Sequence, residues 1–136
     1  MQPLRLLLDT HTLLWAIGKT SELSKTVIKE IKNQNNEILV SAVSLWEIAL
    51  KNSIEKLIVG FDIKDIPEYC IRMGFELIPL EPIDALNSIQ LPRKNNHKDP
   101  FDRMLIYQCI RNGFTLVSRD AAIKVYKKDG LKLIWE

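Results

Sequence analysis

The sequence predicts an α/β domain built on a parallel sheet of four to five strands. Apolar runs of strand length recur along the chain, at 4–8, 37–41, 76–80 and 114–118, with 131–135 as a fifth. Runs this apolar are typical of strands that are buried on both faces. Helix-length amphipathic stretches separate them. Strands that alternate with helices favour a parallel sheet with crossover connections.

The predicted helices begin and end at residues that commonly cap helices. They span 25–33, 45–55, 66–73, 100–112 and 121–128. N-cap residues are expected at Ser24, Ser44, Asp65 and Asp99. Pro100 fits the first position of its helix, because proline lacks the N–H that stays unpaired there. Glycines 74, 113 and 130 follow three of the helices and favour their ends.

Length and composition exclude several classes of protein. The 136 residues suit one domain covering 1–136, and 46% hydrophobic with 26% charged residues is ordinary for a globular protein. A net charge of +2 does not by itself indicate nucleic-acid binding. Cys70 and Cys109 lie far apart and form no zinc motif. Charged residues interrupt the apolar N-terminus, so we expect a cytoplasmic protein without a membrane partner.

Acidic residues follow the strands at the edge where parallel sheets place their ligand sites. Asp9 ends the first strand directly, Glu47 follows the second, and Asp120 follows the fourth. Asp102 lies in the first turn of the predicted helix 100–112. Each acid also has a structural interpretation. Asp9 and Asp120 resemble helix caps, and Ser44 with Glu47 fits a capping box.

Helix geometry distinguishes the two aspartates of the segment HKDPFDRMLI. Asp99 precedes Pro100 and suits the N-cap, where its side chain turns onto the amides of the helix. Asp102, three residues later, can project past the helix start. Asp102 is therefore favoured as the chemical group, and Asp99 remains a further candidate ligand.

The four acids, Asp9, Glu47, Asp102 and Asp120, predict a cation site if they converge. Carboxylates that repel one another either raise their pKa values or hold a cation. Hard oxygen ligands suit Mg²⁺ or Mn²⁺. Such ions catalyse phosphodiester hydrolysis by activating water and stabilising the leaving oxygen.

Three segments together resemble the PIN-domain ribonucleases, and among them the VapC-type toxins of bacterial toxin–antitoxin pairs. The segments are LLLDTHTLLW, VSAVSLWEIALKNSIEKL and HKDPFDRMLIYQCIRNGFTLVSRD, and the likeness runs the whole length of the chain. By motif, Asp9, Glu47 and Asp102 match the core acidic residues of the family. Asp120 matches a fourth, more variable acid.

The resemblance implies a three-layer α/β/α fold and an endoribonuclease that depends on Mg²⁺ or Mn²⁺. It also implies inhibition by a cognate VapB-like antitoxin and assembly into a homodimer. The family often cleaves structured RNAs such as transfer RNA.

Basic and polar residues around the acids predict contacts with RNA. Lysine and arginine give affinity for phosphates without reading sequence. A solvated loop without a function is the other interpretation of the stretch LPRKNNHKDP, and Thr10, His11 and Ser118 could instead orient water or metal ligands. Trp15, Trp46 and Trp135 are expected to fill core or interface space. The predicted RNA contacts are Thr10, His97, Lys98, Arg103, Ser118 and Arg119, and Arg93 and Lys94 also flank the acids.

Two other hydrolase-like classes fit less well. Haloacid-dehalogenase-like phosphatases need a second aspartate two residues after the first, where this chain has His11. Receiver domains need paired acids before their first helix, and this chain has none there. A catalytically silent PIN-like module that binds RNA or protein is the alternative function. The presence of all four acids ranks it second.

Overall fold

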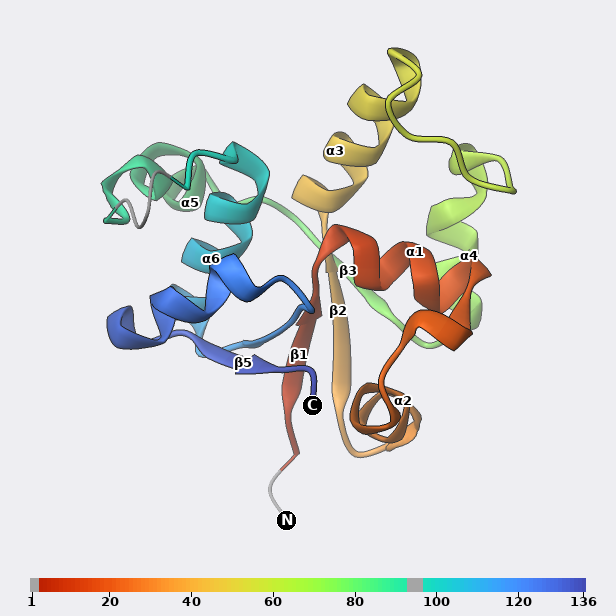
Figure 1. Cartoon of the computed structure of the whole chain (residues 1–136), viewed down its shortest axis with the longest axis horizontal. Helices are drawn as coiled ribbons and strands as arrows, with labels where there is room; N and C mark the ends of the chain where they lie inside the picture. Colours follow the sequence, from red (N-terminus) through yellow and green to blue (C-terminus); the bar gives the residue numbers. More distant parts are fainter. Residues whose placement is uncertain (1–2, 93–96) are drawn as a thin grey trace.

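The computed structural model describes residues 3–92 and 97–136, and its centre is a five-stranded parallel sheet (Figure 1). The strand order is β3-β2-β1-β4-β5. The parallel sheet and the fifth strand are therefore confirmed. The strands are β1 (Arg5–Leu8), β2 (Glu37–Ser41), β3 (Glu76–Ile78), β4 (Thr115–Val117) and β5 (Lys132–Ile134).

Helices connect the strands in the predicted alternation. The α-helices are α1 (Thr10–Gly18), α2 (Lys25–Lys32), α3 (Ala42–Ser53), α4 (Ile66–Arg72), α5 (Pro82–Asn87) and α6 (Pro100–Asn112). Short 3₁₀ helices are η1 (Thr20–Glu22), η2 (Ile63–Asp65), η3 (Ser88–Gln90) and η4 (Ala121–Asp129). The segment expected as a helix over 121–128 is thus 3₁₀, and the predicted helix ranges include neither α1 nor α5.

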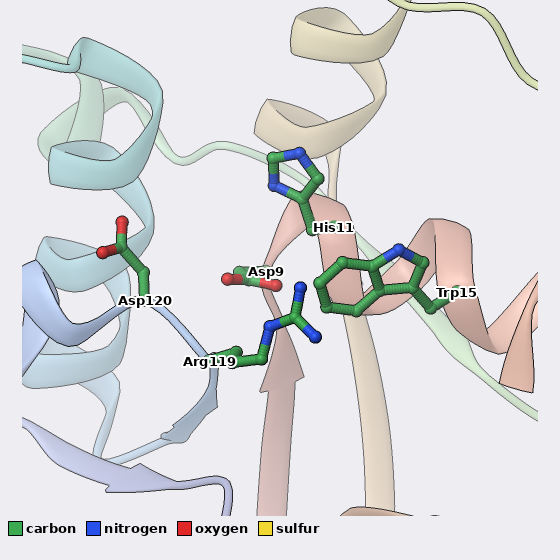
Figure 2. A pocket seen from close by; sticks show the side chains of 5 residues that line it. All are labelled: Asp9, His11, Trp15, Arg119 and Asp120. Atoms are coloured by element: carbon green, nitrogen blue, oxygen red, sulfur yellow. The ribbon is translucent and has the colours of Figure 1, made fainter. Parts of the chain in front are cut away.

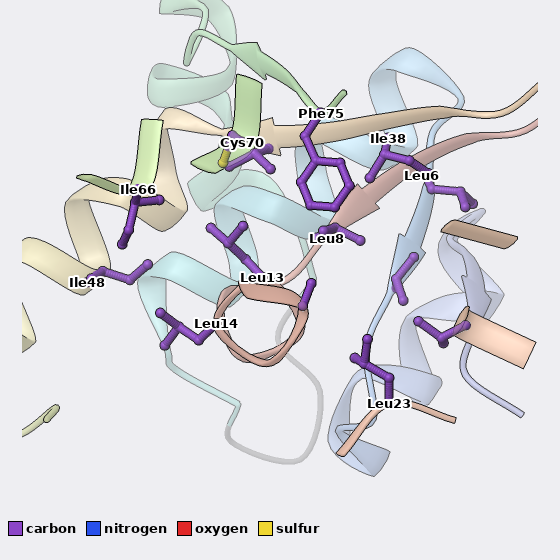
Figure 3. Packing of buried hydrophobic residues seen from close by; sticks show 14 residues of the cluster. Leu6, Leu8, Leu13, Leu14, Leu23, Ile38, Ile48, Ile66, Cys70 and Phe75 are labelled. Atoms are coloured by element: carbon purple, nitrogen blue, oxygen red, sulfur yellow. The ribbon is translucent and has the colours of Figure 1, made fainter. Parts of the chain in front are cut away.

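Alternate residues of the central strands fill two separate cores. Leu6 and Leu8 of β1 join the cluster that includes Leu13 of α1 and Cys70 of α4 (Figure 3). Leu7 points to the opposite face, where it joins Leu105 and Ile106 of α6. Side chains alternate between the faces of a strand, so a strand that is apolar throughout serves both cores.

The helices form one layer on each face of the sheet (Figure 1). Helices α1, α2 and α4 lie on one face, and α5, α6 and η4 lie on the other. Helix α3 extends beyond the carboxyl ends of the strands. The three-layer α/β/α arrangement is therefore confirmed. Among the residues that the structure describes, no helix has the length and apolar character needed to cross a membrane.

The start of α3 differs from the prediction. The helix begins at Ala42, and its N-cap is Ser41, whose hydroxyl accepts a hydrogen bond from the Val43 amide at 3.1 Å. Ser44 lies inside the first turn, so Ser44 and Glu47 do not form a capping box. Strand β2 continues directly into α3 without a loop. The Glu47 carboxylate is therefore not used in a capping box and can make other contacts.

Candidate active site

Asp9 lies at the junction of β1 and α1, and its carboxylate is mostly buried. Its Oδ1 accepts a hydrogen bond from the Thr12 amide at 2.9 Å, so Asp9 is the N-cap of α1. Burial raises the pKa of Asp9, and hydrogen bonds from Ser118 and Thr12 partly offset that rise. The carboxylate is thus held in place at the carboxyl edge of the sheet.

Glu47 of α3 is buried, and both of its carboxylate oxygens have partners. The Thr10 hydroxyl donates to Oε1 at 2.5 Å, and the Lys51 ammonium donates to Oε2 at 2.5 Å. Thr10 lies 3.2 Å from the Ser44 hydroxyl as well. Lys51 follows Glu47 by one helical turn, the spacing at which opposite charges pair on a helix surface. The start of α1 and the side of α3 therefore orient this carboxylate together.

Asp99 and Asp102 occupy the start of α6 in different ways. Asp99 Oδ1 accepts hydrogen bonds from the amides of Phe101 at 2.9 Å and Asp102 at 3.0 Å. The prediction that Asp99 is the N-cap, with Pro100 behind it, is confirmed. Asp102 lies in the first turn, with 22% of its side chain exposed. Its carboxylate is not used by the cap and remains available at the edge of the sheet.

Asp102 is the electrostatic centre of the acidic group. The pKa of its carboxyl is raised to about 8, first by burial and then by the charges of Asp99, Glu47, Asp9 and Asp120, in that order. An acid whose pKa is raised by four other carboxylates marks a place with excess negative charge. The topology thus brings Asp9, Glu47, Asp102 and Asp120 within electrostatic reach of one another, together with Asp99.

A cavity of about 290 Å³ opens beside two of the acids. Asp9, His11, Trp15, Arg119 and Asp120 line it (Figure 2). Asp120 is exposed, and its Oδ1 accepts a hydrogen bond from the Ala122 amide at 2.9 Å at the start of η4. The Arg119 guanidinium lies over the Trp15 ring, 4.3 Å from its centroid. The cavity is therefore lined by carboxylates, a cationic side chain and an aromatic ring.

Arg103 was predicted to contact RNA, but the structure places it in a different setting. Its side chain is buried at 5% exposure, and not on the surface where the predicted contact with RNA would lie. The guanidinium donates to the backbone carbonyls of Leu91 and Pro92 and to the Tyr126 hydroxyl. Arg103 therefore ties α6 to the segment before it. Tyr126 also contacts His97, 2.9 Å from Nδ1, while His97 Nε2 lies 3.3 Å from Asp102 Oδ2.

Thr10 and Ser118 are also buried, so the structure does not favour their predicted contacts with RNA. Thr10 supports Glu47 and Ser118 supports Asp9, as described above. Lys98 and Arg119 are exposed and remain predicted contacts for RNA phosphates. Arg93 and Lys94 lie outside the described residues.

The acidic residues fit a partly hydrated Mg²⁺ ion. Their oxygens are the hard donors that this ion prefers, and the excess charge around Asp102 favours a cation. Within residues 3–92 and 97–136, no three carboxylate, imidazole or thiol groups converge closely enough to form a complete coordination sphere. Mg²⁺ keeps several waters and commonly binds one or two carboxylates directly. The donors present therefore suit an ion held partly through water.

Comparison with known protein families shows to which family this chain belongs. The family model of the PIN domain matches residues 6–129, which include all of the acids described above. The chain belongs to the PIN domain family.

Similar proteins support the membership over nearly the full length. This PIN-domain chain is 23% identical over 133 residues to the ribonuclease VapC22 of Mycobacterium tuberculosis, across 95% of this chain and 97% of that protein. The VapBC structure of Salmonella typhimurium, with bound DNA, superposes with a TM-score of 0.66 at 19% identity over 96% and 97% of the two chains. VapBC2 of Rickettsia felis, bound to a promoter fragment, gives 0.65 at 19% identity over 98% and 100%.

Sequence reasoning missed two residues of the site, Lys51 and Trp15, whereas His11 was already named beside the acids. Lys51 carries a detectable signal, because it follows Glu47 at the i, i+4 spacing. His11 and Trp15 share one side of α1, also four residues apart, and both line the cavity. Trp15 was expected to fill core or interface space, yet only part of its ring is buried. Trp15 lies beside the acids together with Arg119, which comes from a distant part of the chain. A contact between such distant residues is not visible in the sequence.

Proposed function

We propose that this PIN-domain chain is an endoribonuclease dependent on Mg²⁺ or Mn²⁺ and that it is the toxin of a toxin–antitoxin pair. The observation that carries the proposal is the raised pKa of Asp102 among four other carboxylates. Buried acids with strongly shifted pKa values are typical of functional sites. The similarity to a VapC ribonuclease supports the same class of reaction.

Asp9, Glu47, Asp102 and Asp120 would hold the ion. When bound, a divalent ion supplies Lewis acidity and lowers the pKa of water for attack on a phosphodiester. Thr10 orients Glu47 through the hydrogen bond to Oε1, and Ser118 and Thr12 orient Asp9. The N-cap bonds of Asp99 set the first turn of α6 and so place Asp102.

Lys51 supports the site before any ion binds. Its ammonium donates to Glu47 Oε2, and the charges of Asp99 and Asp102 also help to raise its pKa. The positive charge offsets part of the repulsion among the acids and holds the Glu47 side chain in one orientation. Lys51 would have to give up part of this contact if Glu47 held the ion.

A VapB-like antitoxin is the expected protein partner, because the similar structures are VapBC complexes. An exposed apolar stripe supports protein contacts by this chain. Trp46, Leu50 and Ile54 follow one another at four-residue spacing along α3, with exposures of 56%, 42% and 54%. Exposed apolar patches commonly mark interaction surfaces. A homodimer remains a prediction, which the molar mass in solution would test.

Cleavage of RNA by the purified protein tests the proposed function. Labelled total RNA is incubated with Mn²⁺ or with EDTA, for the wild type and for Asp9→Asn and Asp102→Asn. We expect cleavage by the wild type with Mn²⁺ alone, and a loss of about 10³-fold in each variant, as when a principal catalytic group is removed. Asp84→Asn, which removes the charge of a buried carboxylate that pairs with Arg111, is the control for loss of stability without change at the acids.

Two outcomes would reject this assignment. Cleavage in EDTA, or full activity of both variants, would contradict the metal-dependent mechanism. RNA binding without cleavage under all conditions would instead favour the silent binding module.

A further inference from the structure

A second cavity lies along α1 and shares two lining residues with the cavity beside the acids. The first holds about 290 Å³ and the second about 370 Å³, and His11 and Trp15 line both. The second cavity runs past Gly18 and Lys19 and is closed by the segment 57–61, which includes Phe61. The rings of His11 and Trp15 therefore border both the cavity with Asp9 and Asp120 and the one along α1, and the two cavities are together called the cleft.

Arg119 is fixed at the boundary between the acids and the rings. Its guanidinium lies 4.3 Å from the centre of Trp15, and Nη1 lies 3.1 Å from Glu22 Oε2. The carboxylate of Glu22 and the Trp15 ring hold the guanidinium plane in place. Figure 2 shows the guanidinium between Asp9 and Trp15, at the wall of the cavity. Its remaining N–H groups suit a phosphate oxygen.

The rings of His11 and Trp15 form the wall next to this cation. Their centroids are 5.7 Å apart and their planes are inclined by 37°. The Trp15 ring is held at its edge by Trp135, at 5.9 Å between centroids. His11 is exposed, and Trp15 is half-buried with the Arg119 guanidinium over its ring, so a ligand in the cleft meets the His11 ring and the part of Trp15 that Arg119 leaves uncovered. Rings placed beside a cation are the usual platform for a nucleobase.

We propose that Trp15, His11 and Arg119 form a nucleotide subsite that takes one unpaired RNA nucleotide next to the cleaved phosphodiester. The inference rests on the proposed ribonuclease function and names its substrate class. The base stacks on the wall made by Trp15 and His11, and a phosphate of the same strand contacts Arg119.

Stacking on this wall requires a base that is free of its partner strand. A base inside an RNA duplex is covered on both faces, whereas a base in a loop or a single strand can turn out. The subsite therefore selects cleavage in unpaired segments. It does not select a base type, because every base offers a ring face for stacking.

Fluorescence of Trp15 tests the subsite without catalysis. The variant Trp46→Phe/Trp135→Phe leaves Trp15 as the only tryptophan, since the sequence contains three. An unpaired oligoribonucleotide is added in EDTA, and an oligonucleotide of the same length that lacks bases serves as the control. We expect quenching of Trp15 by the first and little by the second. Equal quenching by both, or by neither, overturns the proposal and leaves the cleft to a protein partner.

Kinetics test the same subsite in the complete protein. Trp15→Leu is expected to raise KM for an unpaired RNA about tenfold with kcat changed less than twofold, because stacking on one ring is lost. Trp15→Phe should restore most of the affinity, and Trp46→Phe is the control at another exposed tryptophan. An unchanged KM in Trp15→Leu would overturn the subsite.

The two proposals fail in distinguishable ways. Quenching by unpaired RNA together with no cleavage in Mn²⁺ would refute the ribonuclease function and leave the subsite standing. Metal-dependent cleavage together with an unchanged KM in Trp15→Leu would refute the subsite alone.

Discussion

The two ends of α6 place a buried carboxylate in opposite electrostatic surroundings. At the end of the helix, Arg111 pairs with the fully buried Asp84 of α5, through Nε at 2.5 Å and Nη2 at 3.0 Å. At its start, Asp102 is surrounded by carboxylates, and its pKa is raised to about 8. The first carboxylate is neutralised by the fold itself. The second keeps an excess of negative charge, which a bound cation can balance.

This difference separates structural acids from functional ones. A bidentate arginine satisfies a carboxylate and leaves nothing for a ligand to bind. A group of acids that repel one another reduces stability unless an ion is bound. Substitutions at the two ends of α6 should therefore affect different properties of the protein.

The largest loss of stability from a substitution is expected at the neutralised end. Asp84→Asn keeps one acceptor for Arg111 and loses the other, along with the charge. We expect a loss of about 2 kcal/mol in the free energy of unfolding, measured by urea denaturation, because a buried charge-assisted hydrogen bond is removed. RNA cleavage at a temperature below unfolding should be unchanged. A large loss of activity in this variant would link Asp84 to the site.

Lys51 provides the next test, because its charge partly offsets the acids. Lys51→Met is expected to bind Mn²⁺ about tenfold more tightly in calorimetric titration, since a competing cation near Glu47 is removed. Lys51→Arg, which keeps the charge, is the matched control. Equal or weaker Mn²⁺ binding by Lys51→Met would show that Lys51 mainly positions Glu47 for the ion.

The pH dependence of stability follows from Asp102. Its folded pKa of about 8 lies above the ordinary value of 3.8, so between these values the folded state binds more protons than the unfolded state. Without metal, the free energy of unfolding should therefore fall as the pH rises from 4 to 8, by up to about 1 kcal/mol per pH unit. Asp102→Asn lacks this contribution. Parallel stability curves for the two proteins would contradict the raised pKa.

The smallest effect is expected for Asp99. Asparagine keeps the side-chain oxygen that accepts from Phe101 and Asp102, so Asp99→Asn should change the free energy of unfolding by less than about 0.5 kcal/mol. Cleavage of RNA should stay within about threefold of the wild type. A complete loss of cleavage with unchanged stability would make Asp99 a direct ligand.

The sequence predicts the sheet and the acids well because both depend on local patterns. The apolar runs are strands in all five cases, and the helix from Pro100 to Asn112 has the predicted bounds. The N-cap role of Asp99 could be predicted because Pro100 comes directly after it, at the first position of the helix. These features need only a few neighbouring residues, which is why they can be recognised without the fold.

Predictions that depend on distant residues are the ones that fail. Ser44 looks like a cap, yet α3 begins at Ala42 and Ser44 instead contacts Thr10 of α1. Arg103 looks like a surface residue, yet the backbone of Leu91 and the hydroxyl of Tyr126 enclose it. Tertiary contacts decide such positions, and no local pattern encodes them.

Thermal unfolding with increasing Mg²⁺ tests the central claim most directly, namely that the excess charge around Asp102 is a cation site. An ion that binds only the folded state raises the unfolding midpoint with concentration. We predict such a rise in the wild type and in Asp84→Asn, and little or none in Asp102→Asn. An equal rise in the wild type and Asp102→Asn, or none in the wild type, would contradict the claim.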